Sequence, residues 1–198
     1  VFLCEPLEIE DYIPQPIIDV SPPKWNIAHT TWFFEEMILK QFVPGYEVFD
    51  ENYGFLFNSY YNSIGERTLR DHRGDLSRPT VKQVFEYRKY VDEKMNQLLA
   101  ADSSKEISDL VILGLNHEQQ HQELFLTDLK YTFSVNPLFP VYKKDFALVE
   151  IREIETGDFL KVDEGIYEIG FLGDGFHFDN ELGRHKVFLH DYSMQRDL

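Results

Sequence analysis

LGLNHEQQHQELFLTDLKY, residues 113–131, belongs to the longest segment of the chain with a helical repeat. Spacings of four and three connect a series of apolar, small and histidine residues: Leu110, Gly114, His117, His121, Leu124 and Asp128. Residues at these spacings share one face of a helix. Ser103 and Glu106 form a capping-box pattern before the segment, and Pro137 follows it. We therefore predict a helix over residues 104–134 that directs both histidines into a helical bundle.

The two histidines also match a short metal-binding motif. His117, Glu118 and His121 spell H-E-x-x-H, in which two histidines on one helix face grip a metal ion, as in zinc metalloproteases. A protease also needs the glutamate as base and a third ligand. The extended third-ligand motif is missing, and no glutamate occurs in the twenty residues after Leu124. A zinc-dependent hydrolase using HEQQH therefore stays an alternative, as does a bundle whose histidines are structural.

A third histidine lies on another predicted helix. Residues 21–42, SPPKWNIAHTTWFFEEMILKQF, begin with a serine and two prolines and continue without a further proline or glycine until Pro44. One helical face would carry Trp25, His29, Trp32, Phe33 and Glu36. Helical bundles build metal sites from side chains on facing helices. We predict that His29 joins His117 and His121, a set that leaves coordination positions open and suits Zn²⁺ or Fe²⁺.

The rest of the chain divides into a helical and a β-rich part. Thr80 and Gln83 form a capping box before a further helical stripe. After Pro140 the helical period fades, and DFLKV, GIYEIGF and HKVFLHDY are typical of short strands. We predict a mainly α domain over residues 1–137, a linker over 138–157, and the start of a second, β-containing domain over 158–198.

Composition excludes several functional classes. Lys and Arg number 19 against 35 Asp and Glu, a net charge of −16, and such a surface repels nucleic acids. No run of about 18 apolar residues occurs, so we expect no membrane span. Cys4 is the only cysteine, which fits a reducing cytoplasm. The chain has neither an initiator Met nor a signal peptide, so we expect a cytoplasmic fragment of a longer protein.

Several long motifs resemble one enzyme family. SPPKWNIAHTTWFFE, FNSYYNSIGER, RGDLSRPTVKQVFEYR, LGLNHEQQHQELFLTDLKY and GDGFHFDNELGRHKVFL occur in the order found in the ergothioneine-biosynthesis sulfoxide synthases, the EgtB family. The resemblance runs from about Pro6 to the last residue. The ovothiol-type and selenoneine-type sulfoxide synthases share this architecture and are the nearest alternatives.

The resemblance implies a fold and a reaction. The first domain would be a DinB-like four-helix bundle, and the second the opening of a formylglycine-generating-enzyme-like domain of the C-type-lectin sort. A non-haem iron(II) ion would be held by His29, His117 and His121. The enzyme would use O₂ to join the imidazole C2 of hercynine to the sulfur of a thiol donor, γ-glutamylcysteine or cysteine, as a sulfoxide.

The resemblance also implies roles around the metal. Gln120 resembles the residue that contacts the hercynine imidazole. Tyr60 and Tyr61 match tyrosines that line the site, where a phenol could donate a proton; the alternative is that both simply pack. The resemblance further implies that residues of the second domain complete the substrate pocket. They would lie beyond Leu198, so we expect this fragment to need the rest of its own second domain for activity.

An arginine-rich loop and one departure from the family pattern complete the site prediction. Arg67 and Arg70 would bind a donor carboxylate in bidentate fashion, although a solvated loop explains them nearly as well. The loop holds four arginines in all: Arg67, Arg70, Arg73 and Arg78. Asn26 stands where the family more often has histidine, so support for the nearby ligand would differ.

Overall fold

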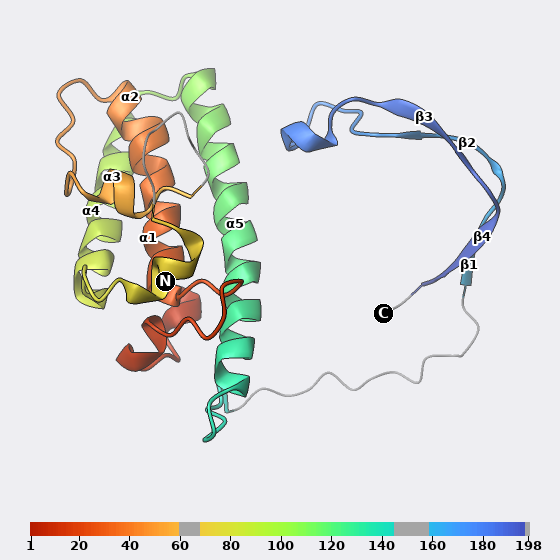
Figure 1. Ribbon diagram of the computed structural model, residues 1–198. Coiled ribbons are helices and arrows are strands. Elements are labelled where there is room, and N and C mark those ends of the chain that lie inside the picture. The colour runs from red at the N-terminus through yellow and green to blue at the C-terminus, as the bar shows by residue number, and fades with distance from the viewer. Residues whose placement is uncertain (60–67, 145–158, 197–198) are drawn as a thin grey trace. The chain divides into compact units, whose positions relative to one another are not determined.

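The computed structural model describes residues 1–59, 68–144 and 159–196 (Figure 1). The chain forms two compact units, Val1–Lys144 and Asp145–Leu198. Within the described ranges, no helix combines the length and the apolar character needed to cross a membrane.

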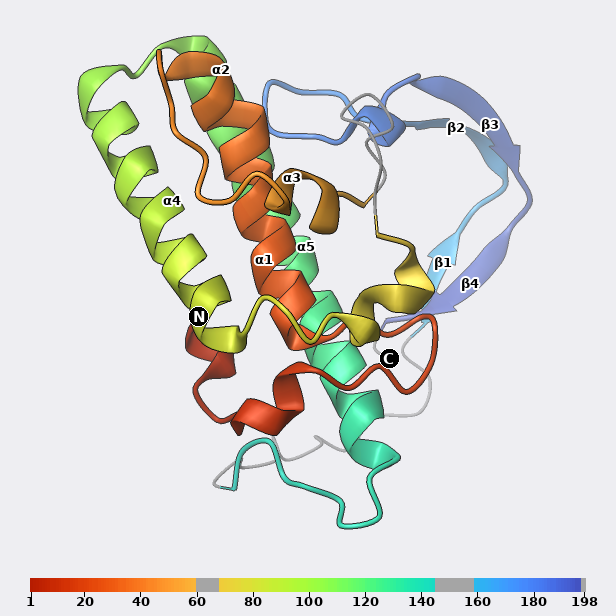
Figure 2. The same cartoon turned by 60° about the vertical axis from the view of Figure 1, so that its left-hand side comes forward.

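The first unit is built on three long helical segments. Its helices are α1 (Pro23–Phe34), a π-helical turn (Glu35–Leu39), α2 (Lys40–Phe42), α3 (Tyr53–Leu56), α4 (Val81–Ala101) and α5 (Lys105–Ser134). Short 3₁₀ turns cover Phe2–Cys4, Ile9–Tyr12 and Arg70–Asp75. α1 packs against both α4 and α5 (Figures 1 and 2). The part of the chain that the structure describes has no fourth long helix, so the predicted four-helix bundle is not confirmed.

α1 is the central helix of this unit. Pro23 occupies its first turn, where the missing N–H costs nothing, and every residue of α1 is buried. A helix that is buried all round has neighbours on all its faces. The predicted helix reaches Phe42 but contains the π-helical turn at Glu35–Leu39, which adds a residue to one turn and rotates everything that follows.

α5 approaches α1 closely because of one glycine. A Cβ atom at Gly114 would lie 2.7 Å from the Phe34 ring and 2.9 Å from the Phe33 ring, so any larger residue would have to displace these rings. The close approach brings the next turn of α5, which carries His117, against α1. The predicted capping box at Thr80 is confirmed on α4. The one predicted at Ser103 is wrong, because Ser104 precedes α5 and makes no side-chain capping bond.

The second unit contains four strands in two antiparallel pairs. The strands are β1 (Phe159–Val162), β2 (Gly165–Ile169), β3 (His185–Leu189) and β4 (Tyr192–Gln195). β2 pairs with β3 in one two-stranded sheet, and β1 pairs with β4 in a second. The three predicted strands are confirmed, and β4 was not predicted. Most apolar side chains here are exposed, for example Ile166 at 70% and Phe188 at 54%.

Candidate metal centre

Three histidines from two helices meet beside α1. His29 comes from α1, and His117 and His121 come from adjacent turns of α5. One ring nitrogen of each lies within 4.8 Å of those of the other two. The ring centroids are 4.6–5.0 Å apart, and His29 is 2% exposed. The structure therefore brings together the three histidines that the sequence predicts as a set.

Hydrogen bonds fix the orientation of two of these rings. His29 Nδ1 donates to the backbone carbonyl of Phe57 at 2.7 Å, which leaves the Nε2 lone pair free. His121 Nδ1 lies 2.9 Å from Asn26 Oδ1. The Asn26 amide nitrogen donates to the Ser21 carbonyl at 3.1 Å, so its oxygen faces His121 and must accept. Metal-binding histidines typically donate their second ring N–H in this way.

His117 differs from the other two histidines. Its Nδ1 is buried, and no described residue forms a hydrogen bond with it. A buried ring nitrogen without a partner costs free energy. A metal ion bound within the cluster is a simple way to engage this ring, so the donor set fits a metal site.

All three imidazoles are neutral near pH 7, as metal ligands must be. Burial lowers the pKa of His117 to about 4, although Glu118 opposes the shift. Burial, and then the charges of His117 and Arg73, lower the pKa of His121 to about 3. Burial is also the main cause that holds the pKa of His29 well below its ordinary value.

Aromatic rings enclose His29 on both sides. Trp25 stacks on one face of the His29 ring at 4.5 Å, and Trp32 on the other at 5.6 Å, each with an interplanar angle of 16°. Phe33 lies 5.1 Å from the His117 ring. The spacing of Trp25, His29 and Trp32 along the sequence predicted a shared face, and the structure confirms it.

A buried arginine extends this stack. Arg73 is 5% exposed, and its guanidinium carbon lies 3.4 Å from the centre of the Trp25 ring. Its two terminal nitrogens donate to the hydroxyl groups of Ser21 and Ser59 at 2.8 and 2.9 Å. A permanent positive charge therefore lies one ring away from His29, a position favourable for an anion bound at the cluster.

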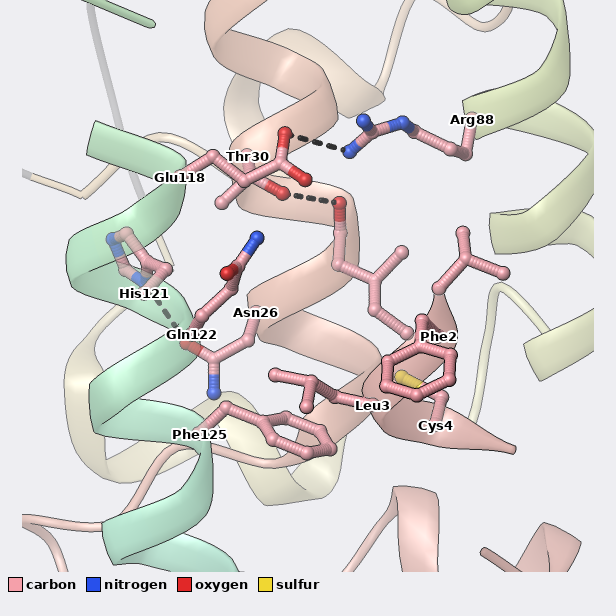
Figure 3. Close-up of a pocket in the computed structure, with 12 residues that line it drawn as sticks. Phe2, Leu3, Cys4, Asn26, Thr30, Arg88, Glu118, His121, Gln122 and Phe125 are labelled. Carbon is pink, nitrogen blue, oxygen red and sulfur yellow. Dashed lines mark hydrogen bonds and ion pairs between the residues drawn. The ribbon is translucent and has the colours of Figure 1, made fainter. Parts of the chain in front are cut away.

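Glu118 is engaged outside the histidine cluster. Its carboxylate lies 3.0 Å from an Arg88 nitrogen, and Arg88 also contacts Asp92 at 2.8 Å. The pair borders a cavity of about 200 Å³ that also touches His121 and Asn26 (Figure 3). The glutamate of the HEQQH motif is thus held by an arginine.

The remaining predicted site residues have different surroundings. Gln120 is exposed on α5. Arg70 is exposed, and its guanidinium donates to the Asp19 carbonyl at 2.6 Å. Tyr60, Tyr61 and Arg67 lie outside the described residues, and their predicted roles stay predictions.

Two supports of the site are not apparent from the sequence. Arg73 was one of four arginines in a loop, and its burial depends on the stack with Trp25, which no local pattern encodes. The Phe57 carbonyl accepts the hydrogen bond from His29 Nδ1. Because it is a backbone group, the residue type at position 57 does not predict this bond. Trp25, one helical turn before His29, was the feature of the sequence that could have indicated an arginine partner, since arginine stacks well on indole.

Comparison with known families assigns the first unit. The model of the DinB superfamily matches residues 2–125, more than half of the chain, and the match includes all three histidines. No curated protein matches the chain. The superfamily includes metal-binding enzymes, and a three-histidine cluster agrees with that property. The chain belongs to the DinB superfamily.

Proposed function

We propose that the protein is a metal-dependent sulfoxide synthase of the ergothioneine-biosynthesis type, with iron(II) as its metal. It would join hercynine to a thiol donor, γ-glutamylcysteine or cysteine, with consumption of O₂. The carrying observation is the set of three neutral imidazoles held within 4.8 Å of one another. The ordered motifs around these histidines add support from the sequence.

The donor set suits a metal that must also bind substrates. His29, His117 and His121 would hold the ion, and three protein ligands leave coordination positions open. Iron(II) bound there would supply a site for a thiolate and the redox chemistry that O₂ requires. The three neutral histidines keep the full positive charge of the metal, which favours an anionic thiolate.

Residues around the cluster would support substrate binding. Arg73 places a positive charge behind Trp25, where it would stabilise the thiolate or carboxylate of a donor. The stack of Trp25, His29 and Trp32 excludes water from one side of the site. Substrate contacts by Gln120, Tyr60, Tyr61, Arg67 and Arg70 remain part of this proposal, as does completion of the pocket by a formylglycine-generating-enzyme-like second domain.

The proposed reaction balances without a further reductant. The C2–H bond of hercynine and the S–H bond of the donor break, and a C–S bond forms. One oxygen atom of O₂ becomes the sulfoxide oxygen. The other leaves as water with the two released hydrogens.

The zinc-hydrolase alternative is less well supported by the site. A metalloprotease uses the glutamate of H-E-x-x-H as its general base. Glu118 instead forms an ion pair with Arg88 at 3.0 Å, and both side chains are only 18% exposed. A carboxylate paired in this way is a poor base for water.

Anaerobic loading with Fe²⁺, followed by hercynine, a thiol donor and air, tests the proposal. Mass analysis should detect the sulfoxide product, and His117→Ala should abolish it. A protein that binds iron tightly yet forms no sulfoxide with either donor would contradict the proposal.

Glu118→Gln separates the two enzyme classes. The change preserves the shape of the side chain but removes its basicity. A sulfoxide synthase should keep most of its activity, whereas a zinc hydrolase should lose nearly all peptide or ester hydrolysis.

A further inference from the structure

A second buried polar cluster lies one and a half helical turns beyond His29 on the same segment. Glu35 begins the π-helical turn and is 1% exposed. Its carboxylate accepts hydrogen bonds from the Tyr87 hydroxyl at 2.6 Å, the Tyr46 hydroxyl at 2.8 Å and the Phe49 backbone N–H at 3.1 Å. Among the described residues, no cation forms an ion pair with it. Two phenols therefore share one buried carboxylate as hydrogen-bond acceptor.

Tyrosines continue from this cluster in two directions. Tyr53 on α3 contacts the buried Tyr87 ring edge-on at 4.9 Å. On the other side, Tyr46 lies 6.3 Å from the partly exposed Tyr90, and Phe49 lies within 5.6 Å of both Tyr87 and Tyr90. The oxidisable rings thus run from the core of the unit to its surface.

The inner end of this series approaches the histidine cluster. Trp32 stacks on His29, and its indole N–H donates to the Gly54 carbonyl at 3.0 Å. Gly54 directly follows Tyr53, so one hydrogen bond and one peptide unit connect the tryptophan to the tyrosines. In order from the metal centre, the series contains His29, Trp32, Tyr53, Tyr87, Tyr46 and Tyr90.

We propose that this tryptophan–tyrosine series is a one-electron relay that carries oxidising equivalents from the metal centre to the protein surface, with Glu35 as the proton acceptor of the oxidised tyrosine. The proposal rests on the proposed function, because a redox-active metal held by the three histidines would supply these oxidising equivalents. Its role would be protective, when O₂ reacts before both organic substrates are bound.

The relay step conserves electrons and protons. Tyr87 would lose one electron through Trp32 to the oxidant that a bound iron supplies, and the Tyr87 O–H bond would break as that electron leaves. The phenol proton moves along its 2.6 Å hydrogen bond to the Glu35 carboxylate. A small reductant of the thiol or ascorbate class, acting at Tyr90, then returns an electron, and the proton moves back from Glu35 to the phenol.

The geometry favours this chemistry over simple packing. Burial and the neighbouring Glu35 raise the pKa of Tyr87 well above its ordinary value, so the ring stays protonated until it is oxidised. A tyrosine that can pass its proton to a bonded carboxylate is easier to oxidise than one that cannot. The π-helical turn places Glu35 between both phenols, and such turns often occur at functional sites.

Freeze-quench electron paramagnetic resonance of the iron-loaded protein tests the relay. The protein would be mixed without substrates with O₂ in one arm and with hydrogen peroxide in the other. A tyrosyl radical signal is expected, and ring-deuterated tyrosine should narrow it. Tyr87→Phe and Glu35→Gln should each lower its yield severalfold. Absence of a tyrosyl signal in both arms of the unchanged protein would overturn the relay.

Peptide mass spectrometry gives a second measurement that does not depend on the radical signal. In Tyr87→Phe, oxidation of Trp32 and of the three histidines should rise severalfold over the unchanged protein. Tyr12→Phe is the matched control, because Tyr12 is also buried and its hydroxyl donates to a backbone carbonyl outside the series. Equal oxidation in Tyr87→Phe and Tyr12→Phe would refute the proposal.

The two proposals can fail separately. Sulfoxide formation with unchanged damage in Tyr87→Phe would remove the relay and leave the proposed function. A Tyr87-dependent radical in the peroxide arm, with no sulfoxide from either donor, would support the relay and remove the proposed function.

Discussion

The histidine cluster and the Glu35 cluster share one helical segment, which carries His29 and Glu35, yet their hydrogen bonding differs. Glu35 is a single acceptor that receives three donors, so its bonding is complete within the protein. Each of the three histidines instead places one ring nitrogen near those of the other two, and neutral imidazoles that meet through their lone pairs do not stabilise one another. A buried polar cluster whose hydrogen bonds are complete needs no ligand, whereas an incomplete one indicates a missing ligand.

Removal of the Glu35 carboxylate should give the largest loss of stability. Glu35→Ala leaves two buried hydroxyl groups and one backbone N–H without an acceptor, which should lower the free energy of unfolding by about 3 kcal/mol or more. Urea unfolding measures this. Glu36→Ala is the neighbouring control, because Glu36 pairs with Lys40, a half-exposed partner, and should cost clearly less. Equal losses would contradict the contrast between the clusters.

His117→Ala should show the opposite pattern. The metal-free protein should change little in stability, because the buried Nδ1 of His117 has no hydrogen-bond partner to lose. Metal affinity should fall by at least about a hundredfold, since one of three ligands disappears. Titration with Zn²⁺ or Fe²⁺ under competition from a chelator measures it. His72→Ala, an exposed histidine paired with Asp75, should leave the affinity unchanged.

Acid should destabilise the metal-free protein through the same histidines. In the folded state the pKa values of His117 and His121 are about 4 and about 3, below the ordinary value of 6.5. As the pH falls below 6.5, the unfolded chain binds protons that the folded chain does not, so stability decreases down to the folded pKa values. Above about pH 7 this contribution is constant.

Unfolding measurements at a series of pH values, with and without bound metal, test whether stability decreases as the pH falls. Metal should oppose the acid loss, because it binds only the neutral imidazoles. The double change His117→Ala with His121→Ala should flatten the pH dependence of the metal-free protein. An equally steep dependence in that variant would assign the effect to other groups.

Local sequence patterns were sufficient to predict the three histidine ligands but not the residues that surround them. His29, His117 and His121 lie on helical stripes, and a periodic pattern specifies which side chains share a face. The π-helical turn at Glu35–Leu39 interrupts that period without a proline or glycine to mark it, so the burial of Glu35 was not predicted. β4 was missed because YSMQ lacks a clear alternation, and its pairing with β1 supplies the strand.

The arginine neighbour shows a second limit of sequence reasoning. The sequence gives no reason to expect burial of one of the four loop arginines rather than another. The contact with Trp25 in the folded chain distinguishes Arg73. Such a contact joins segments nearly fifty residues apart in sequence. Long-range stacking therefore had to be observed, whereas the helices that carry the histidines could be predicted.

Asn26 gives the most sensitive test of the comparison between the two clusters. It is the hydrogen-bond partner of His121 within the histidine cluster, as the tyrosines are for Glu35. Its amide holds His121 through Nδ1 and is itself fixed by the Ser21 carbonyl. Asn26→Leu should weaken metal binding about 10–100-fold, the usual effect of losing such a partner. Asn26→Asp keeps an acceptor for His121 and should bind metal more tightly than Asn26→Leu. If both variants bind metal like the unchanged protein, packing alone orients His121, and the amide makes no contribution to the site.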